Sequence, residues 1–130
     1  MRNCEGAPLM AIMFLKVKVI NPERPKKMRE CEFLVDSGAV YSVVPQNVLK
    51  GLGIKPSSFQ EFILANGEII TRPIGNAYFE YEGKIRAAPV VFGDKGIFLL
   101  GATTIEAFGM ILDPIRRELK PLPMVLMQEA

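Results

Sequence analysis

The sequence predicts a small, closed, all-β barrel with one or two short helices. Its apolar segments are short, and turns rich in Gly, Pro, Asn and Asp separate them, which is typical of sheets built from hairpins. No long helical pattern alternates with these segments, so a parallel βαβ sheet is not expected. A length of 130 residues fits one domain. We therefore expect residues 1–130 to fold as a single unit.

The first half of the chain predicts a hairpin, a third strand and a short helix. Residues 15–20 alternate apolar and charged side chains, the pattern of a half-buried strand, and residues 28–35 return after a loop that contains two prolines. Residues 40–44 are mostly β-branched and predict another strand. Pro45 then opens a helical turn that residues 51–53, Gly-Leu-Gly, bring to an end.

The middle of the chain predicts two further hairpins. Asn66-Gly67 separates an apolar segment from its return strand, and in such a hairpin we expect both residues at positive φ. A second pair surrounds Glu82-Gly83. The four strands are expected at residues 62–65, 68–71, 77–81 and 84–92.

The last third predicts a short buried strand, a helix and a closing hairpin. Residues 97–100 are fully apolar, and Thr103-x-x-Glu106 matches a capping box that would start a helix ending at Gly109. Residues 110–112 and 118–120 would then pair around a turn. No internal repeat or low-complexity segment interrupts this order.

Missing residue types exclude several classes of chemistry. The chain has no histidine, which excludes Ser-His and Cys-His hydrolases and most catalytic zinc sites. Its two cysteines, Cys4 and Cys31, cannot form a structural zinc site, so no metal is expected. Neither G-x-x-x-x-G-K-[ST] nor G-x-G-x-x-G is present, and no cofactor is expected. An enzyme with this composition must use carboxylates, hydroxyls or lysines.

The charge and hydropathy patterns limit the partners. A net charge of +2, with basic residues scattered along the chain, gives no reason to expect a nucleic-acid partner. The longest apolar run, residues 8–15, is too short to span a membrane, so no membrane partner is expected. The cysteine usage favours the cytoplasm. Hydrophobic residues make up 49% of the chain before 11 glycines are counted, a surplus that indicates a buried subunit interface.

One of the three aspartates has a context that indicates chemistry. Asp94 lies between turn residues and Asp113 precedes a proline, so both are read as turn formers. Asp36 instead follows the apolar triplet 33–35 at the end of a predicted buried strand, and Ser37-Gly38 comes next. Taken alone, this tripeptide is read most simply as an Asx-turn that ends the strand. The surrounding residues decide between the two interpretations.

Those residues resemble the retropepsin-like aspartic proteases. The segment 33–45, Phe-Leu-Val-Asp-Ser-Gly-Ala-Val-Tyr-Ser-Val-Val-Pro, is similar to that family's active-site loop, and residues 98–101, Phe-Leu-Leu-Gly, resemble its second landmark. Residues 64–70 fall where the family places its flap hairpin, and residues 110–114 resemble the strand and turn of cellular members. Ala102 stands where the retroviral pattern has arginine, which indicates a prokaryotic cellular relative. The resemblance covers about residues 15–119.

The resemblance implies a homodimeric aspartic endopeptidase with a retropepsin-like barrel. A peptide or protein would be cleaved by water activated between two Asp36 carboxylates, one from each subunit, because a single Asp-Ser-Gly cannot supply a pair. The residues implied to support the catalytic loop are Ser37, Gly38, Ala39 and Gly101. The residues implied to form the flap are Leu64, Ala65, Asn66, Gly67 and Glu68.

Two other functions fit the same sequence. A non-catalytic dimeric β-barrel could use the same groove to bind peptides or a partner, because a fold does not by itself determine a function. A monomeric interaction domain is a third interpretation. The two ends, residues 1–8 and 121–130, are expected to be flexible or to contribute to an interface between subunits.

Overall fold

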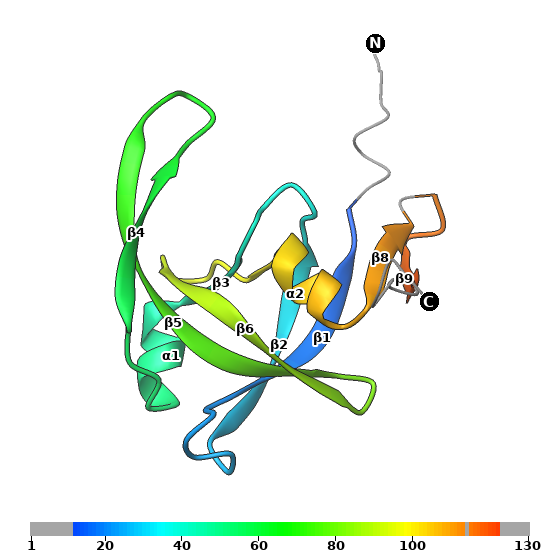
Figure 1. Cartoon of the computed structure of the whole chain (residues 1–130), viewed down its shortest axis with the longest axis horizontal. Helices are drawn as coiled ribbons and strands as arrows, with labels where there is room; N and C mark the ends of the chain where they lie inside the picture. Colours follow the sequence, from blue (N-terminus) through cyan, green and yellow to red (C-terminus); the bar gives the residue numbers. More distant parts are fainter. Residues whose placement is uncertain (1–11, 114, 123–130) are drawn as a thin grey trace, which may run out of the picture.

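The computed structural model describes residues 12–113 and 115–122, which contain nine strands and two short helices (Figure 1). In chain order they are β1 (Phe14–Ile20), β2 (Met28–Val35), β3 (Ser42–Pro45), α1 (Gln46–Gly51), β4 (Ser58–Ile63), β5 (Ile69–Tyr81), β6 (Lys84–Gly93), β7 (Leu99–Leu100), α2 (Ala102–Ala107), β8 (Met110–Asp113) and β9 (Glu118–Pro121). The predicted all-β class with two short helices is confirmed.

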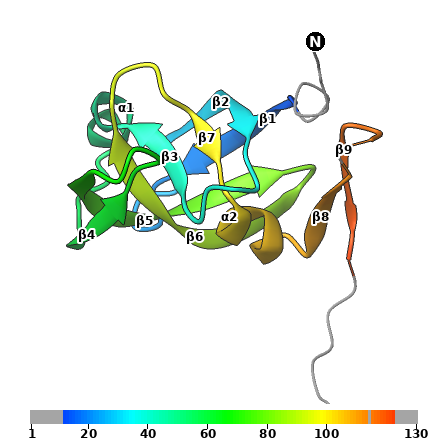
Figure 2. The same cartoon turned by 90° about the horizontal axis from the view of Figure 1, so that it is seen from above.

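Seven strands pair in the order β1-β2-β7-β3-β6-β5-β4. Strand β1 also pairs with β5, at Val19 opposite Phe79, so the strands close into a ring and β4 extends it at β5. This ring of strands is the observed form of the predicted barrel. The β8–β9 hairpin is a separate two-stranded sheet at the edge of the molecule (Figure 2).

The short strand β7 determines where the two sequence landmarks meet. It lies between β2 and β3, parallel to β2 with Leu100 opposite Val35 and antiparallel to β3 with Leu99 opposite Val43. Because β2 and β7 run in the same direction, both leave the sheet at the same edge. The residue after β2, Asp36, therefore lies beside the end of β7.

Aromatic packing holds the end of β2 in place. Phe33 and Phe79 are fully buried, and their ring centroids lie 6.3 Å apart at an interplanar angle of 65°. Phe98 adds a second edge-to-face contact to Phe33 at 5.7 Å. Burying one such side chain contributes about 1.5–3 kcal/mol. The core thus anchors the strand three residues before Asp36.

The turn geometry expected at Asn66-Gly67 occurs instead at Glu82-Gly83. In the turn between β5 and β6, Glu82 and Gly83 both have positive φ, 51° and 82°. At the Asn66-Gly67 turn only Gly67 does, at 89°, so the expectation that Asn66 also has positive φ is wrong. Leu64 and Glu68 close this turn with a 2.8 Å hydrogen bond, which makes it a three-residue loop.

Several strand boundaries differ from the prediction because distant partners set them. Strand β4 begins at Ser58, earlier than expected, and β5 is one continuous strand where two were predicted. Pro73 is tolerated in β5 because it lies opposite Phe59 of β4 before the pairing with β6 begins at Ile74, so a partner strand lies on one side only. Strand β3 begins at Ser42, because the preceding two residues belong to the Asp36 loop.

The predicted chain ends fall almost entirely outside the described residues. Residues 1–8 and 123–130 lie outside them, while Pro121 ends β9. Cys31 is a buried free thiol, and burial raises its pKa above the usual value. Within residues 12–113 and 115–122, no helix is both long and apolar enough to cross a membrane.

Candidate active site

Asp36 occupies a tight turn at the end of β2. Its backbone N–H donates to the Leu100 carbonyl at 2.9 Å, which extends the pairing of β2 with β7 by one residue. Its Oδ1 accepts a hydrogen bond from the Gly38 N–H at 2.9 Å, an Asx-turn. Among the described residues no other side chain bonds or pairs with this carboxylate, which is half-buried. Both the structural and the chemical interpretation of Asp36 are therefore compatible with its position.

The three residues after Asp36 complete the loop. The Ala39 N–H donates to the Asp36 carbonyl at 3.1 Å, so residues 36–39 form a closed turn. Ser37 and Gly38 are exposed, whereas Ala39 is half-buried. A Cβ on Gly38 would lie 3.2 Å from Asp36 Oδ1. The small residue keeps the space next to the carboxylate open.

Gly101 lies directly behind the loop. A Cβ at this position would come within 2.5 Å of the Tyr41 carbonyl carbon and oxygen and 3.0 Å of the Ala39 oxygen. Backbone atoms cannot move aside as a flexible side chain can, so the crossing requires a glycine. The chain passes from β7 to α2 at this point, against the carbonyl face of the Asp36 loop.

The first turn of α2 is bound to this loop by its backbone. The Ala102 N–H donates to the Ala39 carbonyl at 2.7 Å, and the Thr103 N–H donates to the Val40 carbonyl at 2.9 Å. The helix N-cap is Gly101, without a side-chain hydrogen bond, so the predicted capping box starting at Thr103 is wrong. The loop carbonyls satisfy N–H groups that a capping side chain would otherwise serve.

A buried hydroxyl pair lies beneath the loop, and the sequence analysis did not identify it. Ser42 Oγ accepts a hydrogen bond from the Gly101 N–H at 3.0 Å and lies 2.6 Å from Thr104 Oγ1. Both side chains are fully buried. The hydroxyl after the family-like loop is visible in the sequence, but its partner lies 62 residues further on and carries no local signal.

A groove of about 560 Å³ lies beside the Asp36 loop. Its floor is formed by the loop that carries Asp36 and by β3, and its walls come from the β4–β5 hairpin, β6 and the loop that follows β6. Asp36 itself does not line it. The residues that line the groove are mostly apolar: Val40, Tyr41, Val43, Phe62, Ile63, Leu64, Ile70, Val91 and Ile97. Such a volume and lining suit a segment of peptide with apolar side chains.

The residues that the sequence predicts as a flap lie in the β4–β5 hairpin. It rises beside the groove, and in Figure 1 its tip and the Asp36 loop between β2 and β3 both reach the upper side of the view. Phe62 contacts the floor, because its ring packs edge-to-face on Tyr41 with centroids 6.3 Å apart. Of the five predicted flap residues, Leu64 lines the groove. The others form the exposed tip: Ala65, Asn66, Gly67 and Glu68.

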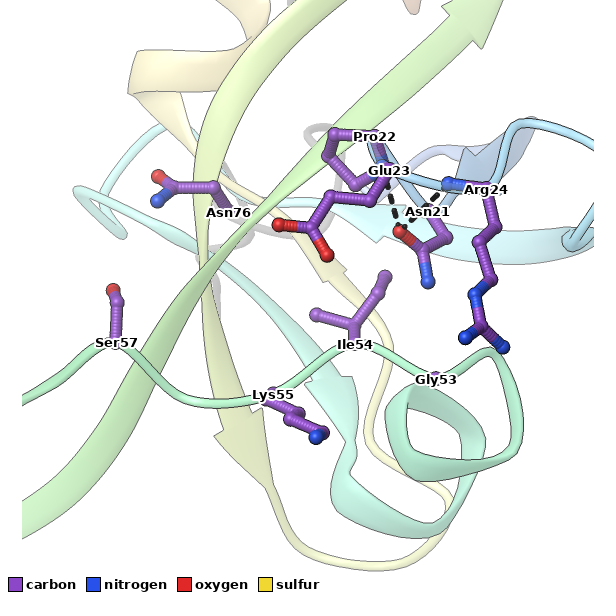
Figure 3. Close-up of a pocket in the computed structure, with 9 residues that line it drawn as sticks. All are labelled: Asn21, Pro22, Glu23, Arg24, Gly53, Ile54, Lys55, Ser57 and Asn76. Carbon is purple, nitrogen blue, oxygen red and sulfur yellow. Dashed lines mark hydrogen bonds between the residues drawn. The ribbon is translucent and has the colours of Figure 1, made fainter.

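A second hollow, of about 610 Å³, lies at the other end of the β1–β2 hairpin (Figure 3). Its lining is largely polar, and Asn21, which is buried there, already has partners: its Nδ2 donates to the Leu52 carbonyl at 2.8 Å and its Oδ1 accepts from two backbone N–H groups. Asp36 lies at the far end of β2. This hollow is therefore separate from the Asp36 loop.

Titratable side chains do not cluster elsewhere in a way that suggests a metal. Within the described part of the chain, no group of three or more Cys, Asp or Glu side chains is placed to hold an ion. In the Asp36 loop, residues 36–39, the carboxylate of Asp36 is the one side-chain group able to take a proton from water. The ionisable side chains that line the neighbouring groove are Tyr41, Arg72 and Asp94.

Comparisons with known proteins agree with this arrangement. The model of the aspartyl protease family matches residues 20–104. The solution structure of the simian foamy virus (mac) protease superposes with a TM-score of 0.53 at 17% identity, over 72% of this chain and 92% of that one. No curated protein sequence matches the chain.

A second solved structure is a foamy viral protease-reverse transcriptase in complex with an RNA/DNA hybrid. It superposes with a TM-score of 0.57 at 16% identity and covers 89% of this chain, while the chain spans 13% of that longer protein. At these identities the two superpositions establish the fold. The family model covers more than half of the sequence, including Asp36, residues 64–68 and Gly101. The chain therefore belongs to the aspartyl protease family and has its retropepsin-like fold.

Proposed function

We propose that the protein is a homodimeric aspartic endopeptidase with Asp36 of each subunit as the catalytic residue. The single observation that carries the proposal is the position of Asp36. It lies at the end of β2, in a loop that is hydrogen-bonded to the first turn of α2 and that borders an apolar groove. The hydrogen bonds to Leu100 and Gly38 hold the backbone and one carboxylate oxygen. The second oxygen, Oδ2, is left to act on water.

The chemistry follows from two carboxylates that share one proton. The ionised carboxylate takes a proton from water as the water oxygen attacks the peptide carbonyl carbon, and the protonated one donates to the carbonyl oxygen. When the resulting intermediate breaks its C–N bond, the departing amine takes a proton from the pair. Two carboxyl groups so close cannot both ionise, which keeps one proton between them.

A second copy of the chain would supply the second carboxylate. In a two-fold dimer the same loop from each subunit meets its mate at the axis. Exposed apolar side chains support an interface: Phe14 at the start of β1 is 57% exposed, and Ile115 in the β8–β9 turn is 90% exposed. Figure 1 shows the start of β1 and the β8–β9 hairpin on the same side of the molecule.

The remaining site residues receive roles from this arrangement. Ser37, exposed at the loop, would hydrogen-bond across the axis, and Gly38 would let the substrate backbone approach Asp36. Closure of the tip of the flap, residues 64–68, over a bound peptide would exclude water from the reaction. We place the protein in the cytoplasm, supported by the free thiol of Cys31.

The test is the activity of Asp36→Asn, with Glu23→Gln as the control that removes one carboxylate charge at an exposed position in the β1–β2 turn, at the other end of β2 from Asp36. We expect the first variant to lose peptide hydrolysis and stay folded and dimeric, and the second to keep it. When wild-type and Asp36→Asn subunits are mixed one to one, the activity should be about a quarter of that of the same total amount of wild-type protein. The reason is that random pairing gives two Asp36 residues to about a quarter of the dimers. If half of that activity remained, each wild-type subunit would be active by itself, which would contradict a site shared between two subunits.

The same experiment separates the alternative functions. Saturable peptide binding by the wild-type dimer without any hydrolysis would favour the non-catalytic binding barrel. Hydrolysis by a protein that sediments as a monomer at micromolar concentration would contradict the shared mechanism.

A further inference from the structure

The groove contains two charged side chains, and they face each other. Arg72 on β5 and Asp94 in the loop after β6 both line it, and their Nη2 and Oδ1 atoms lie 3.6 Å apart. The other lining residues are uncharged. Any selection of a charged substrate side chain by this groove must therefore act through one of these two residues.

The strand register aims Arg72 into the groove. Gln60 of β4 lies opposite Arg72, and Phe62 lies opposite Ile70, so these four side chains share one face of the flap hairpin. All four line the groove. Arg72 stands two residues beyond Ile70 towards the base of the hairpin, away from the tip. A peptide held under the flap would pass this guanidinium.

The ion pair is weak enough to be exchanged. Its separation of 3.6 Å is longer than a direct hydrogen bond, and the side chains of Arg72 and Asp94 are 37% and 78% exposed. Exposed pairs of this kind contribute little to stability. Among the described residues, no side chain or carbonyl accepts a hydrogen bond from the Arg72 guanidinium, and the ion pair with Asp94 is its one recorded polar contact. Its remaining N–H groups are free to bind a carboxylate side by side.

The local charge favours an anion over a cation. Lys95 follows Asp94 directly and is exposed just outside the groove lining, so Arg72, Asp94 and Lys95 together give this end of the groove a net charge of +1. A substrate lysine would meet this surplus of positive charge, whereas a substrate carboxylate would be attracted to it. The planar guanidinium also matches the geometry of a carboxylate.

We propose that Arg72 is a specificity-determining residue that binds an acidic side chain of the peptide substrate. Asp94 holds the guanidinium in place while the groove is empty and yields it when a substrate carboxylate arrives. The inference rests on the proposed function and deepens it. A two-fold dimer repeats Arg72 in both subunits, so the preference for Glu appears at two positions, equally far on either side of the cleaved bond.

The probe is a set of fluorescein-labelled peptides of about ten residues, long enough to cross the groove of both subunits. Each has a Leu-Phe pair at its centre, and the flanking residues are Ser and Ala. Each flanking position in turn carries Glu, Gln or Lys. Cleavage is measured as kcat/KM with wild-type protein, and binding as Kd with Asp36→Asn, which removes the proposed chemistry. We expect Glu to be preferred over Lys by about tenfold at the two positions, less so at high salt.

Three variants separate substrate binding from the ion pair itself. Arg72→Gln should reduce the Glu-to-Lys ratio to within about twofold. Asp94→Asn breaks the same pair but keeps the guanidinium, so it should raise that ratio. Arg24→Gln, in the β1–β2 turn and outside the groove, is the matched control for net charge and should leave the ratio unchanged.

The outcomes are distinct. The assignment would be overturned if Asp94→Asn or Arg24→Gln lowered the Glu-to-Lys ratio as much as Arg72→Gln does. It would also be overturned if the wild-type protein showed no preference for Glu or bound no peptide at all. Cleavage without a Glu preference would overturn this inference alone. A Glu preference in binding without any cleavage by the wild-type protein would contradict the proposed function and leave the inference standing.

Discussion

Ser42 Oγ and Thr104 Oγ1 lie 2.6 Å apart in the fully buried space beneath the Asp36 loop. Ser42 begins β3, the strand that follows the Asp36 loop, and Thr104 lies in α2, the helix that packs behind the loop. The contact therefore joins these two elements. The Gly101 N–H also donates to Ser42 Oγ, at 3.0 Å. The hydroxyl of Ser42 therefore bonds both to the Thr104 side chain and to the Gly101 backbone, which lie behind the Asp36 loop.

Replacing Ser42 with alanine should destabilise the protein. The Gly101 N–H would lose its acceptor in a buried position, which costs about 1–3 kcal/mol of unfolding free energy. Urea unfolding at one fixed protein concentration measures this change. Ser58→Ala, at an exposed position of β4, is the control and should stay within about 0.5 kcal/mol of the wild type. Equal stability of Ser42→Ala and the control would refute the role of the hydroxyl.

Gly101→Ala should be destabilising because its Cβ meets backbone. The added atom would lie 2.5 Å from the Tyr41 carbonyl group, and overpacking of this kind costs about 1–3 kcal/mol. Gly51→Ala is the matched substitution, since nothing lies within 4 Å of its Cβ and it ends helix α1. We expect the thermal midpoint to fall for the first variant and to stay or rise for the second. The reverse order would contradict the close crossing.

The two aromatic residues of β4 should behave differently. Phe62 packs on Tyr41 inside the groove, whereas Phe59 is 69% exposed. Aromatic contacts of this type contribute about 0.5–1.5 kcal/mol beyond area burial, so Phe62→Ala should lower kcat/KM for a peptide substrate by about tenfold. Phe59→Ala should change it by less than about twofold. Equal effects would show that the hairpin acts only through its overall stability.

Cys31 should make the folded state less stable as the pH rises. Burial raises the pKa of its thiol in the folded protein above the unfolded value, so near and above that unfolded value the unfolded chain releases a proton that the folded chain keeps. The unfolding free energy then falls as the pH rises above about 8, where the unfolded thiol begins to ionise. Wild-type protein should lose more stability over this range than Cys31→Ala in urea unfolding. Parallel pH profiles would exclude the thiol as the cause.

Much of this fold could be predicted because local pattern and long-range structure agree. Strands β1 and β2 follow the alternation of their side chains, and Asp36 is visible because its neighbours carry a motif. Thr103 was misread because a capping box is a local pattern, while the N–H groups of α2 find acceptors at residues 39 and 40, about sixty positions earlier. Local sequence carries no record of such a partner.

The turn at Asn66-Gly67 shows the same limit at short range. The dipeptide favours two residues with positive φ, yet the hairpin closes between Leu64 and Glu68 and leaves that geometry to Glu82-Gly83. Loop length depends on the register of β4 with β5, which the whole sheet determines. The approach of Arg72 to Asp94 depends on a different register, that of β5 with β6, in which Ile74 lies opposite Val91, and it was not predicted either.

The most direct test of the shared active site is the distance between the two Asp36 carboxylates in an experimental structure of the dimer. If the two carboxylates act as a pair, an oxygen of one lies about 3 Å from an oxygen of the other, close enough to share a proton. Carboxylates held further apart than a single bridging water can span, in every dimer that the protein forms, would contradict it.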